Sequence, residues 1–322
     1  IDRILPPTVT GSIAIIIGLS LSANALANAC SIPETVAEIQ KATATSWAWI
    51  IALITLLSTI LYSVYLKGKL SQLPVLCGLA TGYVSALIIG AATGIPFVNF
   101  NTVTSDSILS LPIFTLPKPS LAAIIAIMPI AIATIPESTA HIYQLDIYVN
   151  DLAKRKGAKR YDIEGKLGLN LVGDGLGDII SGFIGGPAGT NYGENISTMA
   201  ITKNFSVSVL IAASIITMII SCFTPLINIV YSIPTPVIGG LSIYLFGVIA
   251  AQGITIMMDK KVDMFSARNL AVIAVILIVG LGGSFNFEGG MIPAFGTQFP
   301  ALATAAVVGI ILNLLLSIGD KE

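Results

Sequence analysis

Two acidic residues stand in apolar segments, and the first of them is accompanied by a histidine. Glu137 follows Pro136 and precedes His141, the only histidine in the chain. Residues at i and i+4 share one face of a helix, and a histidine beside a carboxylate can relay its proton. Pro136 removes one backbone hydrogen bond and can open the helix locally. This group predicts a carboxylate that meets a substrate; a Glu–His pair that only stabilises a helix end is the alternative.

The second acidic residue, Glu194, follows a run rich in glycine. The run Gly185-Gly-Pro-Ala-Gly-Thr-Asn-Tyr-Gly-Glu194-Asn195 cannot form an ordinary helix, so we expect an extended, broken segment and then a short helix to about Thr202. Non-helical backbone at membrane depth is tolerated only against protein or a water-filled cavity. Amides at a helix N-terminus can also donate to a substrate carbonyl. A binding site is predicted here, with a favourable helix-dipole position for Glu194 as the alternative.

The chemistry of these groups suggests the kind of ligand. An ionised carboxylate only accepts hydrogen bonds, whereas a protonated one also donates. A ligand with adjacent N–H donors and C=O acceptors, as in a nucleobase, would match Glu137, Glu194 and the helix amides. A proton shared by Glu137 and His141 could couple transport to a proton gradient. Asp174 and Asp178 repel each other at i,i+4, and we expect them near Asn170 in a supporting or purely structural role.

The composition excludes soluble, disordered and disulfide-framework proteins. Of 322 residues, 55% are apolar and only 10% are charged, and the mean hydropathy is +0.91; a soluble domain has about 25% charged residues. The net charge of −1 argues against an extended nucleic-acid surface. Cys30, Cys77 and Cys222 lie in or beside apolar runs without metal-ligand spacing, so they are interpreted as small apolar fillers.

The remaining class is a polytopic membrane protein. A helix needs about 20 apolar residues to cross a bilayer, and the chain offers eight such runs and two weaker ones, which predicts ten crossings. The eight runs are Thr8–Ala27, Trp47–Leu66, Leu73–Thr93, Leu121–Ala140, Val207–Ile229, Val237–Met257, Leu270–Gly283 and Ala301–Ile318, and the weaker two are Leu167–Ile184 and Thr190–Thr202.

The basic residues favour one orientation. With the basic loop between Leu145 and Lys166 in the cytoplasm, alternation of ten crossings places fourteen of the 16 basic residues on that side. Only Lys41 and Lys118 fall on the other side. We therefore expect a cell-membrane (inner or plasma membrane) protein with both ends of this sequence in the cytoplasm.

An internal repeat relates the first and eighth crossings. The second member of each pair follows the first by 229 positions: Ile4/Ile233, Pro7/Pro236, Gly11/Gly240 and Gly18/Gly247. A repeat of seven crossings places its two copies in opposite orientations, which is typical of secondary transporters. If the second copy is complete, four crossings and on the order of a hundred residues precede Ile1, and the whole protein has fourteen.

The residues around Glu194 resemble a known signature. The segment Asn191-Tyr-Gly-Glu-Asn-Ile-Ser-Thr-Met-Ala-Ile-Thr-Lys203 is similar to that of the nucleobase–ascorbate transporters (nucleobase:cation symporter 2), and most to their uracil permease branch. The Pro-Glu-x-x-x-His pattern at Glu137 and the segment Ile233–Gly253 also match. The resemblance covers the whole chain and implies an all-α protein of fourteen helices in a 7+7 inverted repeat, with a short β-strand in the broken helix before Glu194.

The resemblance also implies a division into a core domain and a gate domain. Gate helices 5–7 occupy residues 1–95, core helices 8–11 occupy residues 121–231, and gate helices 12–14 occupy residues 232–322. The first four core helices, which include a helix with the opposing strand, are then absent from this sequence. The family resemblance further implies homodimers through the gate domain, within the lipid bilayer, and no cofactor beyond the proton gradient.

The same resemblance assigns residue roles. It implies that Glu137 and Glu194 contact the base beside the Gly193 backbone, and that His141 couples protons. The residues expected beside them in the site are Tyr192, Phe246 and, in support, Asn195. The chain departs from the family pattern in having Ser197 for glycine, Phe246 for an aromatic with a hydroxyl, and Pro136 for a small residue. These departures leave the identity of the base open.

The leading hypothesis is a uracil importer driven by proton symport. A xanthine or urate permease of the same family is the alternative, against which Glu194 argues because many such members have glutamine there. An anion transporter of the related fold is a second alternative, but an anion should not face two carboxylates. A non-transporting scaffold would leave the cost of buried acids unexplained, and no nucleophile–base or metal constellation predicts an enzyme.

Overall fold

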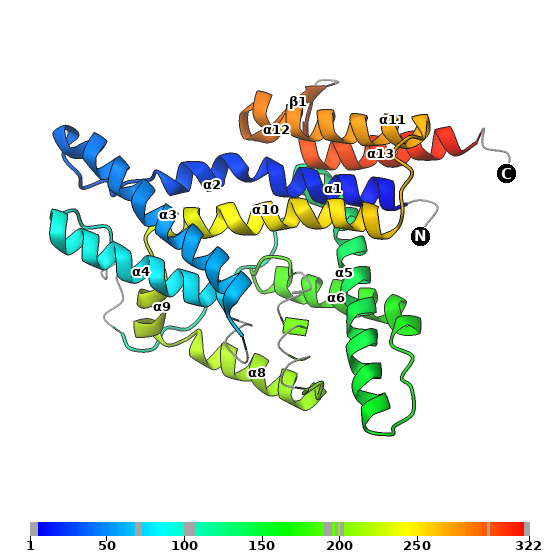
Figure 1. The fold of residues 1–322 in the computed structure, drawn as a ribbon, viewed down its shortest axis with the longest axis horizontal. Helices are drawn as coiled ribbons and strands as arrows, with labels where there is room; N and C mark the ends of the chain where they lie inside the picture. The colour runs from blue at the N-terminus through cyan, green and yellow to red at the C-terminus, as the bar shows by residue number, and fades with distance from the viewer. Residues whose placement is uncertain are drawn as a thin grey trace.

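The computed structural model describes residues 6–67, 73–99, 107–189, 195–196, 199, 203–294 and 297–318. This part of the chain is mainly helical (Figure 1). The helices are α1 (Pro7–Ser20), α2 (Ser22–Ala29), α3 (Lys41–Tyr65), α4 (Pro74–Thr93), α5 (Leu121–Arg155), α6 (Leu167–Phe183), α8 (Val207–Ile220), α9 (Thr224–Tyr231), α10 (Thr235–Asp259), α11 (Ala267–Leu277), α12 (Gly283–Asn286) and α13 (Ala301–Ser317).

Five of the described spans are long and apolar enough to cross a membrane. They are Pro7–Ala29, Glu38–Tyr65, Pro74–Thr93, Thr235–Met258 and Ala267–Asn286, and α8 and α13 are shorter apolar helices. With α5 and α6, they coincide with nine of the ten predicted crossings. The tenth, Thr190–Thr202, lies largely outside the described residues, of which Asn195, Ile196 and Met199 are helical. The chain is therefore a helical, multi-pass membrane protein.

The two helices related by the internal repeat, α1 and α10, lie side by side (Figure 1). They are antiparallel, since Gly11 of α1 meets Gly253 while Gly18 meets Phe246 earlier in α10. A Cβ atom at Gly18 would lie 2.5 Å from the carbonyl oxygen of Phe246, and one at Gly11 would lie 2.7 Å from that of Gly253. The glycines therefore allow the two backbones to approach each other closely, as small residues do in membrane helix pairs.

Helices α3 and α4 extend this bundle at one end. A Cβ atom at Gly240 of α10 would meet the backbone of Ala52 in α3, so a second pair of helices also depends on a glycine. Hydroxyl groups join the helices as well: Tyr62 of α3 contacts Thr81 of α4 (3.1 Å), and Tyr244 of α10 donates to Ser63 of α3 (2.6 Å).

Helices α11 and α13 cover the other side of α1. Val9, Ile13 and Ile16 of α1 pack with Ile276 of α11 and residues of α13 in a buried apolar cluster. The two outer helices are also joined by a polar contact, in which Arg268 of α11 donates to the Asn313 side chain of α13 (3.1 Å).

An antiparallel hairpin precedes α13, and it was not predicted. Strands β1 (Met291–Ala294) and β2 (Thr297–Pro300) pair with Met291 opposite Pro300. Gly289 and Gly290 before it have φ of 62° and 67°, a left-handed conformation that suits residues without a Cβ. The expectation of helices alone, with one strand before Glu194, was wrong here because hydropathy over a long window does not resolve four-residue strands. The strand expected before Glu194 falls at residues outside the described part.

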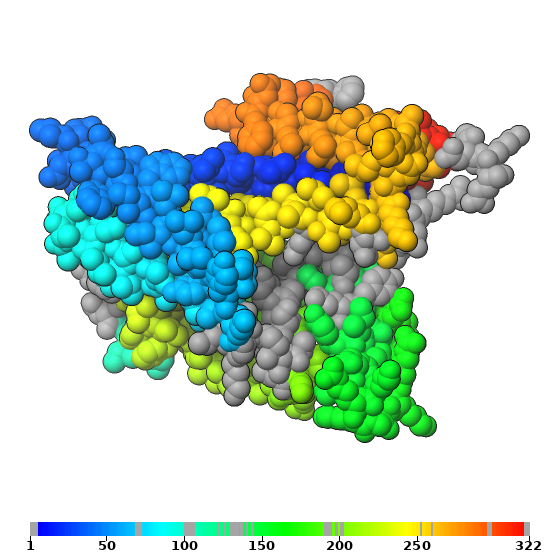
Figure 2. All heavy atoms as spheres, in the orientation of Figure 1, coloured from blue at the N-terminus to red at the C-terminus, as the bar shows by residue number. Residues whose placement is uncertain are grey.

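Helix α5 is longer than its predicted crossing. It has 35 residues, so it continues from the apolar segment ending at Ala140 through a polar half to Arg155. In the space-filling view this half of α5 and the start of the following loop project from the rest of the molecule (Figure 2). Helix α6 returns from the loop, and α8 lies across the lower side of the molecule in this view (Figure 1).

Candidate functional site

Helix α6 has a polar stripe that faces the protein and apolar faces that are exposed. Asn170, Asp174, Asp178 and Ser181 recur at helical spacing and are half-buried. The exposed positions include Leu169, Val172, Leu176, Ile179, Ile180 and Phe183, each at least 55% exposed. A helix of a soluble protein shows the reverse pattern. Intramembrane carboxylates usually face a bundle interior or a water-filled cavity, so the stripe marks a polar interior.

Helix α6 also holds the glycine-rich segment that follows it. The backbone N–H of Gly189 donates to the Asp178 carboxylate (2.6 Å), and the Ser181 hydroxyl donates to the carbonyl of Pro187 (2.7 Å). The N–H of Gly186 donates to the carbonyl of Ser181 (2.8 Å). Residues 186–189 are irregular, as the glycine run predicts. Asp178 and Ser181 therefore fix the backbone that leads toward Glu194.

A second extended segment, residues 107–120, runs beside this region before α5 begins. The N–H of Thr115 donates to the carbonyl of Ile184 at the end of α6 (3.4 Å). Thr115 also occupies the space next to Gly185, whose φ of 91° favours glycine. Farther along, Leu109 forms a bridge with Phe223 between α8 and α9. The start of the broken segment is thus in contact with residues of both α6 and the extended segment 107–120.

The acid-bearing turn of α5 includes an unsatisfied polar atom. Ser138 is buried, and His141 is half-buried with a buried Nδ1 that has no hydrogen-bond partner among the described atoms. Glu137 lies within α5 one turn before His141, as predicted, but its side chain is not among those described. A buried polar nitrogen needs a partner, so this turn is suited to a polar ligand or to a neighbouring carboxylate.

The other predicted site residues differ in what the structure says of them. Tyr192, Gly193 and Glu194 lie outside the described residues, so their meeting with Glu137 stays a prediction. Asn195 is helical and exposed. Phe246 is half-buried in α10, and its described contact is between its carbonyl oxygen and Gly18 of α1.

Two residues with a positioning role were not singled out from the sequence. Ser181 contacts the broken segment through hydrogen bonds with Pro187 and Gly186, and Thr115 packs against Gly185. Ser181 continues the spacing of Asp174 and Asp178, which is a signal that could have identified it. Thr115 lies far from the segment in sequence, and no local pattern indicates its contact.

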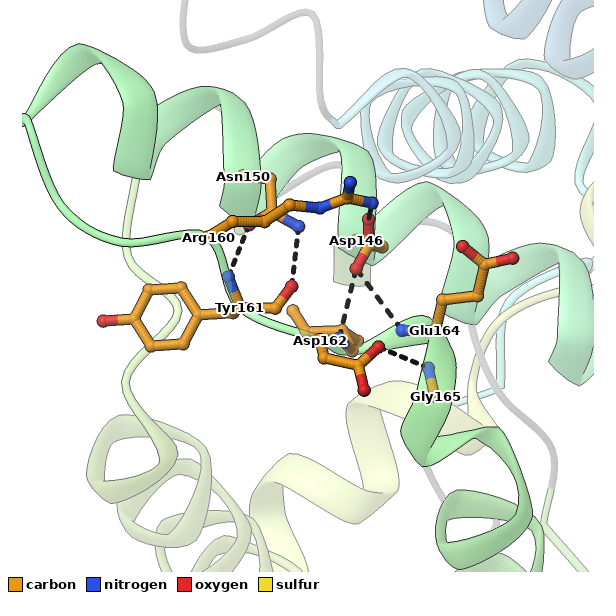
Figure 3. A network of polar contacts seen from close by, with 8 residues as sticks. Asp146, Asn150, Arg160, Tyr161, Asp162, Glu164 and Gly165 are labelled. Atoms are coloured by element: carbon orange, nitrogen blue, oxygen red, sulfur yellow. Dashed lines mark hydrogen bonds and ion pairs between the residues drawn. The ribbon is translucent and has the colours of Figure 1, made fainter.

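The loop that joins α5 to α6, residues 156–166, is fastened to the polar half of α5 (Figure 3). The Asp146 carboxylate accepts from the N–H groups of Ile163 (3.1 Å) and Glu164 (3.3 Å), and it lies 3.7 Å from Arg160. Asn150 exchanges two hydrogen bonds with the backbone of Tyr161. Burial alone raises the pKa of Asp146, but these partners, with a hydrogen bond from Asn150, lower it below its ordinary value.

Comparisons with known proteins cover nearly the whole chain. A sequence model of the permease family (Xan_ur_permease) matches residues 1–289. The uracil permease of Bacillus caldolyticus is 34% identical over 98% of this chain and 68% of the relative. The uracil permease of Bacillus subtilis (strain 168) is 35% identical over 99% of this chain and 70% of the relative. The uracil permease of Escherichia coli (strain K12) is 34% identical, with shares of 99% and 68%.

Proposed function

Because the chain belongs to the permease family of nucleobase:cation symporters, we propose that it carries uracil across the membrane by proton symport. The observation that carries the choice of uracil is the match, over nearly the whole chain, to proteins named uracil permeases. The inward polar stripe of α6 supports transport, since polar groups inside a membrane bundle mark the paths of substrates and ions.

The proposed binding chemistry uses the two acids of the core. Glu137 and Glu194 would accept N–H groups of the base, and the Gly193 amide would donate to a base carbonyl, with Tyr192 and Phe246 as apolar walls and Asn195 in support. The fastening of residues 186–189 to Asp178 and Ser181 supports this assignment. A site that hydrogen-bonds its ligand must be held still, because rigid placement lowers the cost of binding.

The proposed proton carrier is the pair of Glu137 and His141. Their i,i+4 spacing in α5 places them on one helix face. The Nδ1 atom of His141 supports the proposal, since it has no hydrogen-bond partner among the described atoms and could exchange a proton with a carboxylate. Protonation of Glu137 when uracil binds would tie the movement of the base to the proton gradient.

The proposed architecture is a seven-plus-seven inverted repeat with a core and a gate domain. The antiparallel packing of α1 on α10, whose sequences repeat, supports opposite orientations for the two copies. Residues 121–231 would form the core that carries the substrate, and residues 1–95 and 232–322 the gate domain that moves against it and dimerises. The basic loop between α5 and α6 would lie in the cytoplasm.

The test is uracil uptake by the full-length protein in proteoliposomes with an inward proton gradient. We expect labelled uracil to accumulate, excess xanthine to leave uptake unchanged, and Glu194→Gln to reduce uptake at least about tenfold, because hydrogen bonds to a charged group are lost. Asn204→Gln, in the exposed segment before α8, is the matched control. Competition by xanthine would assign the site to purines, and uptake of neither base would contradict a nucleobase site.

A further inference from the structure

A pocket lies beside the polar half of α5, and its lining begins at Leu145, one turn after His141. Its volume is about 610 Å³, and it is bounded by the polar half of α5, the loop of residues 156–166 and the start of α8. One wall is the apolar stripe of α5 made by Leu145, Val149 and Leu152, which recur at helical spacing. The opposite wall includes Val207 and Leu210.

The charged side chains in the pocket lining are all basic. They are Lys156, after the last turn of α5, and Lys203, before α8, and the lining contains no acidic residue. Both lysines are exposed, and neither forms an ion pair with a described residue. The neighbouring arginines differ, since Arg155 pairs with Asp151 (2.8 Å) and Arg160 with Asp146. Two ammonium groups are therefore available to an anion at the mouth of an apolar pocket.

The pocket opens where the apolar surface of the helices begins. Helix α8 starts at Val207, which is 67% exposed, and continues with the exposed Leu210 and Ile211. Lys203 lies just before this apolar surface, on the polar side. An occupant can therefore place a charged end between the lysines and an apolar end along α8.

The pocket wall formed by the loop is fixed in place before any ligand arrives. Tyr161 and Ile163 line the pocket, and the backbone of each is bonded to α5, through Asn150 and Asp146 respectively (Figure 3). A preformed wall reduces the ordering that binding requires.

We propose that this pocket binds a phospholipid with an anionic headgroup. The phosphate lies between Lys156 and Lys203, and an acyl chain packs against Leu145 and Leu210. Basic pockets between membrane helices bind anionic headgroups because the lysines attract the phosphate, and the apolar walls accept the chain. A soluble phosphate would leave the apolar walls unused, so the lipid is the occupant that matches both parts of the pocket.

Native mass spectrometry of the purified full-length protein tests the proposal. Phosphatidylglycerol and phosphatidylcholine with the same acyl chains are titrated against the wild type and the double variant Lys156→Gln/Lys203→Gln. The wild type is expected to bind phosphatidylglycerol more tightly, and the double variant to lose about 10- to 30-fold of that affinity, as two lysine contacts are removed. Lys156→Arg/Lys203→Arg is expected to retain it.

Two further variants separate the pocket from general charge and from free phosphate. Lys154→Gln/Lys159→Gln makes the same charge change in neighbouring positions outside the lining and should keep the wild-type affinity. Leu210→Trp keeps both lysines but fills the apolar part, and it should weaken both lipids. Equal binding by wild type and Lys156→Gln/Lys203→Gln, or an equal loss in the Lys154/Lys159 control, would overturn the proposal. The proposal would also be overturned, in favour of a phosphate site, if millimolar inorganic phosphate displaced the lipid and Leu210→Trp bound the lipid as tightly as the wild type.

Discussion

At the scale of single residues, Asp178 has the clearest positioning role near the proposed site. Its carboxylate accepts the N–H of Gly189 at 2.6 Å, so a residue of the polar stripe fixes the broken segment. Asp174, one turn earlier, repels it. Asp178 offsets the cost of this repulsion through its hydrogen bond to the broken segment.

Replacing Asp178 tests this role. Asp178→Ala removes the acceptor and should raise the KM for uracil about fivefold, since the bond contributes about 1 kcal/mol to holding the segment. Asp178→Asn keeps an oxygen acceptor and should stay within about twofold of the wild type. Uptake kinetics in proteoliposomes measure both. An equal loss in the two variants would show that the charge, and not the hydrogen bond, is required.

Asp146 predicts a pH dependence for the loop between α5 and α6. Its folded pKa is lower than the ordinary value of 3.8, so the carboxylate stabilises the folded loop above that pH, and the stabilisation is lost as the pH falls through the lowered pKa. Hydrogen exchange at the Ile163 and Glu164 amides, corrected for the intrinsic rate, should accelerate below about pH 4. Asp146→Ala should accelerate the same amides already at pH 7.

The matched control is Asp151→Ala, also in the polar half of α5, which removes an exposed ion pair with Arg155. Exposed pairs of this kind contribute little, so exchange at Ile163 and Glu164 should be unchanged. Faster exchange in both variants would mean that the loss of any acid in α5 loosens the loop.

The local placement of site residues was predictable from the sequence where it depends only on residue type and spacing. Glu137 and His141 do lie one turn apart in a helix, and the glycine run is irregular as far as it is described. The partners of Asp178 and Asp146 were not predictable, because each bond joins the residue to backbone more than ten positions away. Which distant N–H group bonds to a carboxylate depends on how the chain folds back on itself. No local sequence pattern indicates that path.

At the scale of helices, the packing of α10 depends on glycines of unequal importance. Gly240 is buried against the backbone of Ala52 in α3, whereas a Cβ atom at Gly247 would meet nothing within 4 Å among the described residues. Both positions belong to the internal repeat, as partners of Gly11 and Gly18. Substitutions at Gly240 and Gly247 therefore distinguish the effect of close helix packing from the general cost of a glycine in a helix.

Substituting these glycines gives opposite expected results. Gly240→Ala forces α10 and α3 apart and should lower the free energy of unfolding by about 1–3 kcal/mol. Gly247→Ala should leave it unchanged or raise it by up to about 1 kcal/mol, because alanine favours the helix. The midpoint of thermal unfolding in one detergent compares them. Equal destabilisation would mean that α10 does not approach α3 as closely as described.

Helix existence was easier to predict than helix ends. Apolar length indicated the segments, because an apolar run of about 20 residues has few other uses. The extension of α5 to Arg155 and the break between α8 and α9 escaped prediction. The extension is polar and invisible to hydropathy, and the break at residues 221–223 is bonded to the distant segment 107–120, with Ser110 donating to the carbonyl of Cys222.

At the scale of the whole molecule, the proposed coupling predicts that one variant separates transport from its driving force. His141→Gln should still exchange uracil across the membrane but lose the acceleration by an inward proton gradient, because glutamine does not titrate. Uptake with and without the gradient measures the ratio of the two rates, which should fall to about one. A ratio equal to that of the wild type would remove His141 from the coupling and leave Glu137 as its carrier.

Counterflow tests most directly whether this permease carries uracil. Proteoliposomes are loaded with unlabelled uracil, diluted into a trace of labelled uracil without any proton gradient, and followed in time. If the protein is a carrier specific for uracil, the label should accumulate transiently above its equilibrium level. Liposomes loaded with xanthine should not show this accumulation. Label that only approaches equilibrium, at the rate of protein-free liposomes, would contradict the claim.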